Sequence, residues 1–317
     1  MRRFLIDTDT ASDDAVAILM ALRHPEIQVE ALTVVCGNVG LDQAVQNALY
    51  TVELCGADVP VYAGAAKPMM RTLEIADYVH GADGMGDCGL PLEGRTPAAG
   101  RGSDVIVDTI LASPGEITLV ALGPLTNVAL AVLRAPEIVD AVSRVVVMGG
   151  TGVKGPGNVS AMAEYNFWAD PEAAQVVARA GLPLELVGWD ISIESAVVDA
   201  ERHTQMKALD TKYSEFAVNI AQAVRRFALN NGLEGDDLPD PIAMAHAIDP
   251  APAEMARLWV DVMVGDGPQR GVLDIDQLGI TDGNPNIDLV TQYPNEHFFH
   301  LLFGLFQDTV DLAAWSS

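Results

Sequence analysis

Basic side chains are scarce in this chain. It has 18 Lys and Arg residues against 44 Asp and Glu residues, which gives a formal net charge of −26 over 317 residues. A nucleic-acid polymer or an anionic membrane surface would repel such a protein, so we expect neither as a partner. Most of the acids are expected to be solvated surface residues. The composition therefore fits a soluble protein whose partner is neither a nucleic-acid polymer nor an anionic membrane surface.

Cysteine and long apolar runs are scarce as well. Cys36, Cys55 and Cys88 are odd in number and lack the spacing of a metal site or a disulfide framework, so we expect small core residues in a reducing compartment. No uninterrupted apolar run approaches the ~20 residues that span a bilayer. The N-terminus reaches Asp7 after three apolar residues, too soon for a signal peptide. The predicted location is the cytoplasm.

Strand-like apolar runs alternate with helical patterns along the chain. Strands are predicted at residues 4–6, 29–35, 59–62, 117–122, 145–148, 184–187, 258–264 and 287–291, and helices at 13–23, 41–54, 105–111, 125–133, 171–180, 200–209, 216–229, 242–247 and 296–306. Strands rich in Val, Ile and Leu without clean alternation are typical of strands buried on both faces. The pattern predicts an α/β fold, a single domain over residues 1–317 with an open, mainly parallel sheet flanked by helices. Residues 69–102 and 149–163 are predicted to be loops.

Four aspartates, Asp7, Asp9, Asp13 and Asp14, lie between the first strand and the first helix. In an open α/β sheet, ligands bind at the carboxyl ends of the strands. Carboxylates held close together repel one another unless a cation lies between them, and oxygen ligands suit Ca²⁺ or Mg²⁺. Helix capping would explain one or two of these acids but not all four. The cluster therefore predicts a hard-cation site at an active site.

Further polar residues follow later strands. Asn38 follows the second strand, and the run from Gly123 to Asn127 follows residues 117–122. Glu164 and Asn166 share one side of an extended stretch among aromatic residues, which suits recognition of hydroxyl groups. Asp170 and Asp240 each precede a proline, as the N-cap of a helix with Pro at the next position would.

The pattern Asp7-x-Asp9-x-x-x-Asp13-Asp14-Ala15 resembles the N-terminal fingerprint of the inosine–uridine-preferring nucleoside hydrolase family. Further blocks continue the resemblance in family order to about residue 250: Gly37-Asn38-Val39, His80-Gly81, Gly123-Pro124-Leu125-Thr126-Asn127, Met148-Gly149-Gly150, Gly157-Asn158-Val159, Ala163-Glu164-Tyr165-Asn166, Ala169-Asp170-Pro171-Glu172-Ala173 and Asp240-Pro241. The resemblance implies a nucleoside hydrolase-like fold with a Rossmann-like core. It implies hydrolysis of the N-glycosidic bond of ribonucleosides to free base and ribose, in purine or pyrimidine salvage. It also suggests a homodimer or homotetramer.

The resemblance further implies a role for each site residue. The ligands of a Ca²⁺ ion would be Asp9, Asp14, Asp240 and the backbone carbonyl of Leu122. Asp9 would be the general base that activates a Ca²⁺-bound water, and Asp7 would help to hold the loop. The ribose would be bound by Asp13, Asn38, Asn158, Glu164 and Asn166, with Met148 lining the sugar pocket.

One position departs from the family. Many members carry His immediately before the aspartate that matches Asp240, as the acid that protonates the leaving base, and this chain has Pro239 there. Proline cannot donate a proton, so activation would come from His80, His246, a water, or stacking on Phe227 or Trp168. His80 has the better position of the two histidines, because it lies in the loop-like segment 69–102, and either a catalytic or base-contacting role or a structural role is open to it. His246 lies in an apolar helical pattern and fits a core or surface histidine better.

Two other functions are compatible with parts of the sequence. Leu5-Ile6-Asp7-Thr8-Asp9 resembles the strand-end motif of haloacid-dehalogenase-type phosphatases, which use Mg²⁺ with the first Asp as nucleophile. That motif leaves Asp13, Asp14 and the Glu164–Asn166 block unexplained, and Ala11 stands where that family has Thr or Val. Pro239 would also suit a nucleoside- or ribose-binding protein without turnover. Retention of Asp9 argues against this, since binding alone needs no base.

Overall fold

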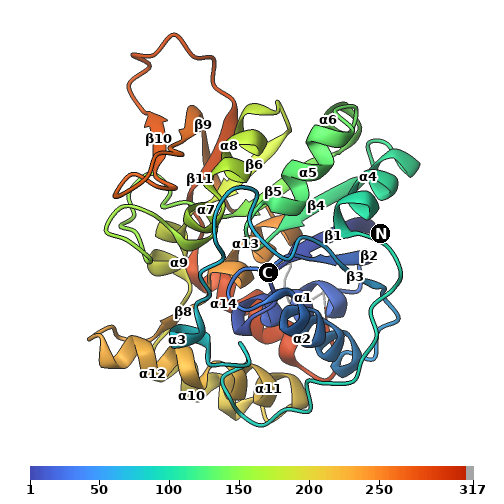
Figure 1. Cartoon of the computed structure of the whole chain (residues 1–317). Helices are drawn as coiled ribbons and strands as arrows, with labels where there is room; N and C mark the ends of the chain where they lie inside the picture. The colour runs from blue at the N-terminus through green and yellow to red at the C-terminus, as the bar shows by residue number, and fades with distance from the viewer. Residues whose placement is uncertain (312–317) are drawn as a thin grey trace.

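The computed structural model of the chain describes residues 1–311 and contains a nine-stranded sheet with the order β10-β9-β11-β6-β5-β4-β1-β2-β3 (Figure 1). Neighbours from β3 to β11 are parallel, while β9 is antiparallel to both β10 and β11. The strands are β1 (Arg2–Thr8), β2 (Ile27–Val34), β3 (Val61–Ala63), β4 (Ile117–Ala121), β5 (Arg144–Met148), β6 (Leu184–Val187), β9 (Glu254–Val262), β10 (Leu273–Asp276) and β11 (Ile287–Gln292). A separate antiparallel pair joins β7 (Val197–Val198) to β8 (Asp236–Asp237). The predicted α/β fold with a mainly parallel sheet is confirmed.

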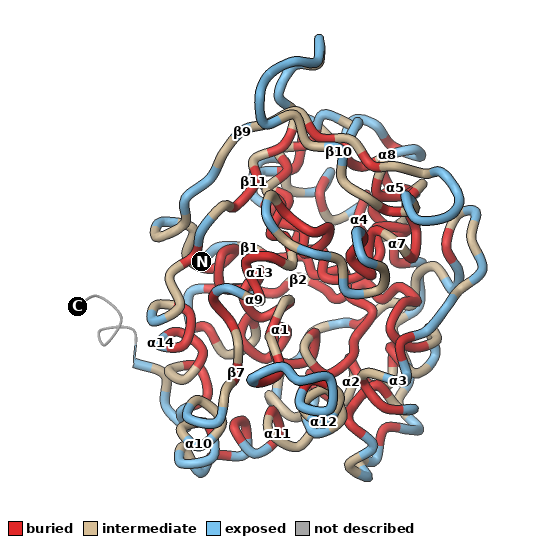
Figure 2. Tube along the Cα trace, turned by 90° about the vertical axis from the view of Figure 1, so that its left-hand side faces the viewer, coloured by how far each residue is buried: buried red, intermediate tan, exposed pale blue. Residues whose placement is uncertain are grey.

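Helices cover both faces of the sheet. Phe4 and Ile6 of β1 pack into one hydrophobic core and Leu5 packs into the other, because successive side chains of a strand point to opposite faces. The helices are α1 (Ser12–Arg23), α2 (Leu41–Leu54), α3 (Asp77–His80), α4 (Gly102–Ala112), α5 (Thr126–Arg134), α6 (Ile138–Ala141), α7 (Tyr165–Ala169), α8 (Pro171–Arg179), α9 (Trp189–Ser195), α10 (Ala200–Ala208), α11 (Lys212–Ile220), α12 (Gln222–Asn230), α13 (Pro239–Ile248) and α14 (Asn295–Phe306). Residues of α1, α2, α13 and α14 form the first core, and residues of α4, α5 and α8 form the second. Figure 2 shows the buried segments in the interior of the molecule.

Several predicted elements differ in the structure. The single helix expected at residues 216–229 is two helices, α11 and α12, with a bend at Ala221. The segment expected as a loop passes close to this bend, since a Cβ atom on Gly86 would lie 2.5 Å from the carbonyl oxygen of Ile220. That segment is not entirely a loop, because it contains α3, and His80 is a buried residue of this helix. The bend lets α12 reach α3, where the ring centroids of Tyr78 and Phe227 lie 5.9 Å apart.

The two predicted N-caps have different outcomes. Asp170 is the N-cap of α8, where its side chain accepts a hydrogen bond from the backbone N–H of Ala173. Asp240 is not an N-cap, because α13 begins one residue earlier, at Pro239, and Leu238 occupies that position. Proline at the first helical position loses no intrahelical hydrogen bond. Asp240 therefore lies in the first turn of α13, and α13 packs against α1.

Candidate active site

A cavity of about 260 Å³ lies at the carboxyl ends of the central strands. One side of it is formed by the start of α1, the segments at the ends of β2, β4 and β5, the start of α7, and α13. The polar side chains there are Asp13, Asn38, Asn158, Glu164, Asn166 and Asp240, and Leu122 and Met148 lie among them. Its other wall is largely apolar and aromatic, with Tyr78, Trp189, Val224, Phe227 and Leu233 beside His80. All the residues predicted to bind substrate therefore line one cavity, while Asp9 and Asp14 are buried in its surroundings.

The acid cluster forms one compact group of oxygen atoms. Carboxylate oxygens of Asp13, Asp14 and Asp240 lie within 4.8 Å of one another. One oxygen each of Asp9, Asp13 and Asp240 is buried without a hydrogen-bond partner. Among the ion pairs of residues 1–311, the only basic group that reaches this cluster is His80, 3.7 Å from Asp13. Buried carboxylates without partners are costly, so this donor set fits a hard divalent cation.

Asp9 is held in a narrow space beside this cluster. The backbone N–H of Asn38 donates a 2.6 Å hydrogen bond to Oδ2, which leaves Oδ1 without a partner. A Cβ atom added to Gly37 would lie 2.0 Å from Oδ2, and one added to Gly123 would lie 2.6 Å from Oδ1. The two glycines therefore provide the space that the carboxylate of Asp9 fills. One carboxylate oxygen is fixed by the protein and the other is free to accept a proton.

Asp14 and Asp7 are anchored by neighbouring polar groups. Asp14 accepts hydrogen bonds from the hydroxyl of Thr8 at 2.6 Å and from the backbone N–H of Ala11 at 2.9 Å. Its second bond satisfies a backbone group at the start of α1, so the capping interpretation is correct for this acid. Asp7 accepts hydrogen bonds from Thr33 at 2.6 Å and Asn127 at 2.8 Å. These bonds join the end of β1 to β2 and α5 and hold the acid-bearing turn in place.

Other predicted ligands are organised by internal hydrogen bonds. Glu164 caps α7, with Oε1 accepting from the N–H of Asn166 at 2.7 Å and Oε2 from that of Gly150 at 2.8 Å. The amide of Asn166 donates a 2.7 Å hydrogen bond to the carbonyl of Leu122. A carbonyl has two lone pairs, so Leu122 retains acceptor capacity for a cation. These bonds fix Glu164 and Asn166 at the cavity before any substrate enters.

Comparison with known proteins gives a consistent result over the whole length. The model of the family described as inosine-uridine preferring nucleoside hydrolase matches residues 4–300. This chain belongs to that family. A pyrimidine-specific ribonucleoside hydrolase of Escherichia coli (strain K12), RihB, is 34% identical over 303 residues, which cover 95% of this chain and 96% of that protein.

Solved structures agree. The plant nucleoside hydrolase PpNRh1 has a TM-score of 0.91 at 32% identity, covering 97% of this chain and 99% of that chain. A purine-preferring ribonucleoside hydrolase from Gardnerella vaginalis has a TM-score of 0.89 at 29% identity, covering 97% of this chain and all of the other. The predicted family and its reaction, hydrolysis of the N-glycosidic bond of ribonucleosides, are confirmed. The phosphatase and the binding protein without turnover are therefore set aside.

Burial raises the pKa values of the acids in and around the candidate active site of this nucleoside hydrolase. The pKa of Asp7 rises to about 7 and that of Glu164 also to about 7, chiefly because burial penalises the charged form. Burial and neighbouring acids raise the pKa values of Asp13 and Asp14 to about 6, and that of Asp240 well above its usual range. In the absence of a cation, the folded protein therefore retains protons that the unfolded chain, with pKa values of about 4, releases.

This difference predicts how pH acts on stability. The folded state binds more protons between about pH 4 and pH 7, so the free energy of unfolding of the cation-free protein should fall as pH rises through that window. A divalent cation held by these acids would replace the protons, so it should stabilise the protein more at pH 8 than at pH 5. We expect saturating Ca²⁺ to raise the melting temperature of chelator-treated protein by about 5 °C at pH 8. Thermal unfolding at both pH values measures this, and an equal shift at pH 5 and pH 8 would contradict it.

The histidines and the tryptophan proposed for the leaving group occupy different environments. His80 accepts or donates a 3.0 Å hydrogen bond at Nδ1 with the hydroxyl of Ser12, and burial lowers its pKa to about 4, so the ring is neutral at pH 7. His246 is a core residue, with Nε2 2.7 Å from a carboxylate oxygen of Glu185. Trp168 does not line the cavity, and its ring packs 3.7 Å from the guanidinium carbon of Arg270. Of the three, only His80 lines the cavity.

Sequence reasoning missed several residues of the cavity wall, among them Tyr78, Trp189 and Asp237. Trp189 lies two residues after the end of β6, so the rule that ligands bind at strand ends could have identified it. Tyr78 and Asp237 carry no such signal, because α3 and β8 are too short to leave a periodic pattern.

No helix among the described residues is long and apolar enough to cross a membrane. Of the three cysteines, all of them free, Cys36 is buried and Cys55 and Cys88 are half-buried.

Proposed function

We propose that this chain is a Ca²⁺-dependent ribonucleoside hydrolase in which Asp9 is the general base. The observation that supports this most strongly is the group of unpartnered, buried carboxylate oxygens beside a cavity of about 260 Å³. By the family resemblance, Asp9, Asp14, Asp240 and the carbonyl of Leu122 would hold the ion, and the position of Asp13 makes it a further candidate ligand. When bound, Ca²⁺ supplies positive charge that acidifies water and holds the ribose hydroxyls.

The reaction breaks the bond between C1′ of the ribose and a nitrogen of the base. The electron pair leaves with the base, whose nitrogen takes up a proton from solvent. Water attacks the opposite face of the sugar while Asp9 takes its proton at Oδ1 and later returns it to solvent. The transition state has oxocarbenium character, and the surrounding carboxylates stabilise the positive charge that develops on the ribose. With no covalent nucleophile, the configuration at C1′ is inverted.

The polar half of the cavity would bind the sugar. Asp13, Asn38, Asn158, Glu164 and Asn166 provide acceptors and donors for ribose hydroxyls, and Met148 lies among them. The other half would bind the base between His80, Phe227 and their aromatic neighbours. A neutral His80 suits a hydrogen bond to the base, with Ser12 fixing the ring. Because Pro239 cannot donate a proton, departure of the base relies on this wall.

Base preference and assembly go beyond the family assignment. The Escherichia coli relative is named as pyrimidine-specific and the Gardnerella vaginalis protein as purine-preferring, so similarity alone favours neither class of base. We propose that the chain forms one catalytic domain, acts in nucleoside salvage in the cytoplasm and assembles as a homodimer or homotetramer.

Release of free ribose from a panel of purine and pyrimidine ribonucleosides tests the proposal. We expect release with Ca²⁺ and a loss of at least about 10²-fold after chelation, because the acid cluster then lacks its cation. Readdition of Ca²⁺ should restore the rate. Ribose release that continues undiminished with a chelator would contradict the role of the metal. The absence of release from every nucleoside would contradict the substrate.

A further inference from the structure

Asp237 is a carboxylate of the cavity wall to which the proposed reaction gives no role. It lies in β8, which pairs with β7, three residues before Asp240. The indole N–H of Trp189 donates a 2.7 Å hydrogen bond to its Oδ2, and the hydroxyl of Ser192 donates a 2.6 Å hydrogen bond to the same oxygen. Both side-chain donors therefore reach one oxygen. Oδ1 has no side-chain donor within residues 1–311.

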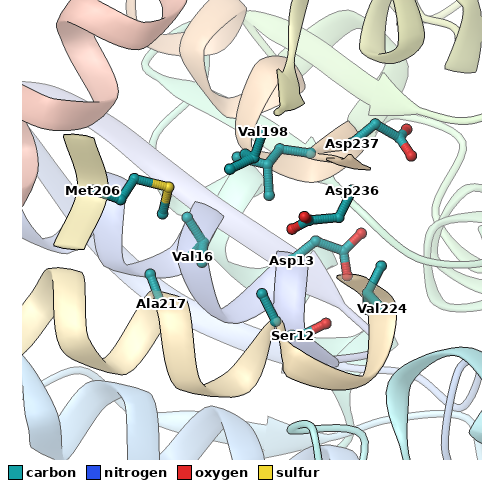
Figure 3. A pocket seen from close by; sticks show the side chains of 11 residues that line it. Ser12, Asp13, Val16, Val198, Met206, Ala217, Val224, Asp236 and Asp237 are labelled. Carbon is teal, nitrogen blue, oxygen red and sulfur yellow. The ribbon is translucent and has the colours of Figure 1, made fainter. Parts of the chain in front are cut away.

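The neighbouring acid, Asp236, has a different environment. Its carboxylate accepts a 2.7 Å hydrogen bond from Arg225, and it does not line the 260 Å³ cavity. Figure 3 shows the carboxylates of Asp236 and Asp237 pointing to different sides of β8. Side chains in this view line a second cavity, to which Asp13, Asp236 and Asp237 all contribute. Its volume of about 30 Å³ is enough for one water. The charge of Asp236 is thus balanced by an ion pair with Arg225. No ion pair joins Asp237 to a basic residue in the described part of the chain.

The surroundings of Asp237 are those of a site for a flat ring. Trp189, Val224, Phe227 and Leu233 line the same cavity as Asp237 and offer apolar and aromatic surface. A carboxylate beside such surface orients a ligand by accepting from its N–H donors. Asp13 and His80 are close enough to interact with Asp237 electrostatically, but the proposed function already assigns them to the ribose and to the base. The group that fits is an N–H at the edge of a nucleobase. An exocyclic amino group is such a donor, whereas an oxo group at the same position presents only acceptors and the nearest N–H of an oxo base lies on the adjacent ring nitrogen.

We propose that Asp237 recognises the nucleobase, with its carboxylate accepting a hydrogen bond from an exocyclic amino group. This inference rests on the proposed ribonucleoside hydrolase activity and adds a determinant of base preference to it. Trp189 and Ser192 are positioning residues, since they hold Oδ2 and leave Oδ1 to the base. Asp237 thereby favours cytidine over uridine and adenosine over inosine, relative to a chain that lacks the carboxylate.

The Asp237→Asn variant tests this proposal with little change of shape. The carbonyl oxygen of Asn can accept both existing hydrogen bonds, which places an NH₂ donor where Oδ1 had been an acceptor. We expect the ratio of kcat/KM for cytidine to that for uridine, and likewise for adenosine to inosine, to fall about tenfold. Asp237→Ser removes the carboxylate altogether and should lower the same ratios. Using ratios cancels any general loss of folded enzyme.

Asp236→Asn is the matched control, because it removes an adjacent buried carboxylate that faces Arg225 instead of the cavity. Its amino-to-oxo ratios should equal those of the native chain. A second reference is 4-nitrophenyl β-ribofuranoside, whose leaving group has no N–H, so its hydrolysis should fall less than that of cytidine in Asp237→Asn. Unchanged ratios in both Asp237 variants, or an equal loss on all substrates, would overturn the proposal. A native chain that releases no ribose would instead refute the proposed function itself.

Discussion

The Asp9→Asn variant is expected to hydrolyse ribonucleosides about 10³-fold more slowly than the native chain, because an amide cannot take a proton from the attacking water. The fold should be retained, since the carbonyl oxygen of Asn can still accept the N–H of Asn38 that now reaches Oδ2. Steady-state ribose release gives kcat, and thermal unfolding in the same buffer shows whether the variant is folded. A folded variant with native kcat would exclude Asp9 as the base.

Asp7→Asn provides a matched control for this experiment. Asp7 is also a buried carboxylate at the end of β1, but its Oδ1 serves two neighbours, Thr33 and Asn127. Its replacement should weaken the anchoring of the turn, so we expect a lower melting temperature and a much smaller loss of kcat. If Asp7→Asn and Asp9→Asn lose kcat equally, the loss belongs to the turn as a whole and not to proton transfer by Asp9.

Removal of the 2′-hydroxyl from the substrate is expected to lower kcat/KM by about 10⁴-fold. The polar half of the cavity contains buried acceptors, including an oxygen of Asp13 that has no hydrogen-bond partner. A missing hydroxyl leaves such a group unpaired in the complex, which costs more than the loss of an exposed contact. Comparing uridine with 2′-deoxyuridine at equal enzyme concentration measures the effect, and a difference below tenfold would contradict hydroxyl recognition by these residues.

The Asp13→Ala variant separates the enzyme's contribution to the preference for ribosides from the intrinsic reactivity of the substrates. Ribosides and deoxyribosides differ in intrinsic reactivity, but that difference is the same for every enzyme variant. If Asp13 contributes to recognition, its removal should reduce the preference for uridine over 2′-deoxyuridine. A preference that persists unchanged in a folded variant would assign the discrimination to other residues.

Sequence patterns predicted the elements that have strong periodicity or a place at a strand end. The turn from β1 into α1 and the residues after β2, β4 and β5 could be anticipated, because parallel strands bring their carboxyl ends to one edge. The features that the sequence did not predict depend on tertiary contacts. The bend at Ala221 lies where Gly86 passes α11, and Trp168 packs on Arg270 instead of lining the cavity. Asp237 could not be identified from the sequence, because its proposed role depends on the hydrogen bond from Trp189, which the fold brings to it from 48 residues away.

The close approach of Gly37 and Gly123 to Asp9 has a consequence for the evolution of this chain. Any side chain at either glycine would occupy the volume of the carboxylate that we propose as the general base. Selection on one acid is thereby imposed on two positions, 28 and 114 residues further along the chain, that supply no functional group. If Asp9 is the base, the turns after β2 and β4 can accept few substitutions at these glycines because of the chemistry at the end of β1.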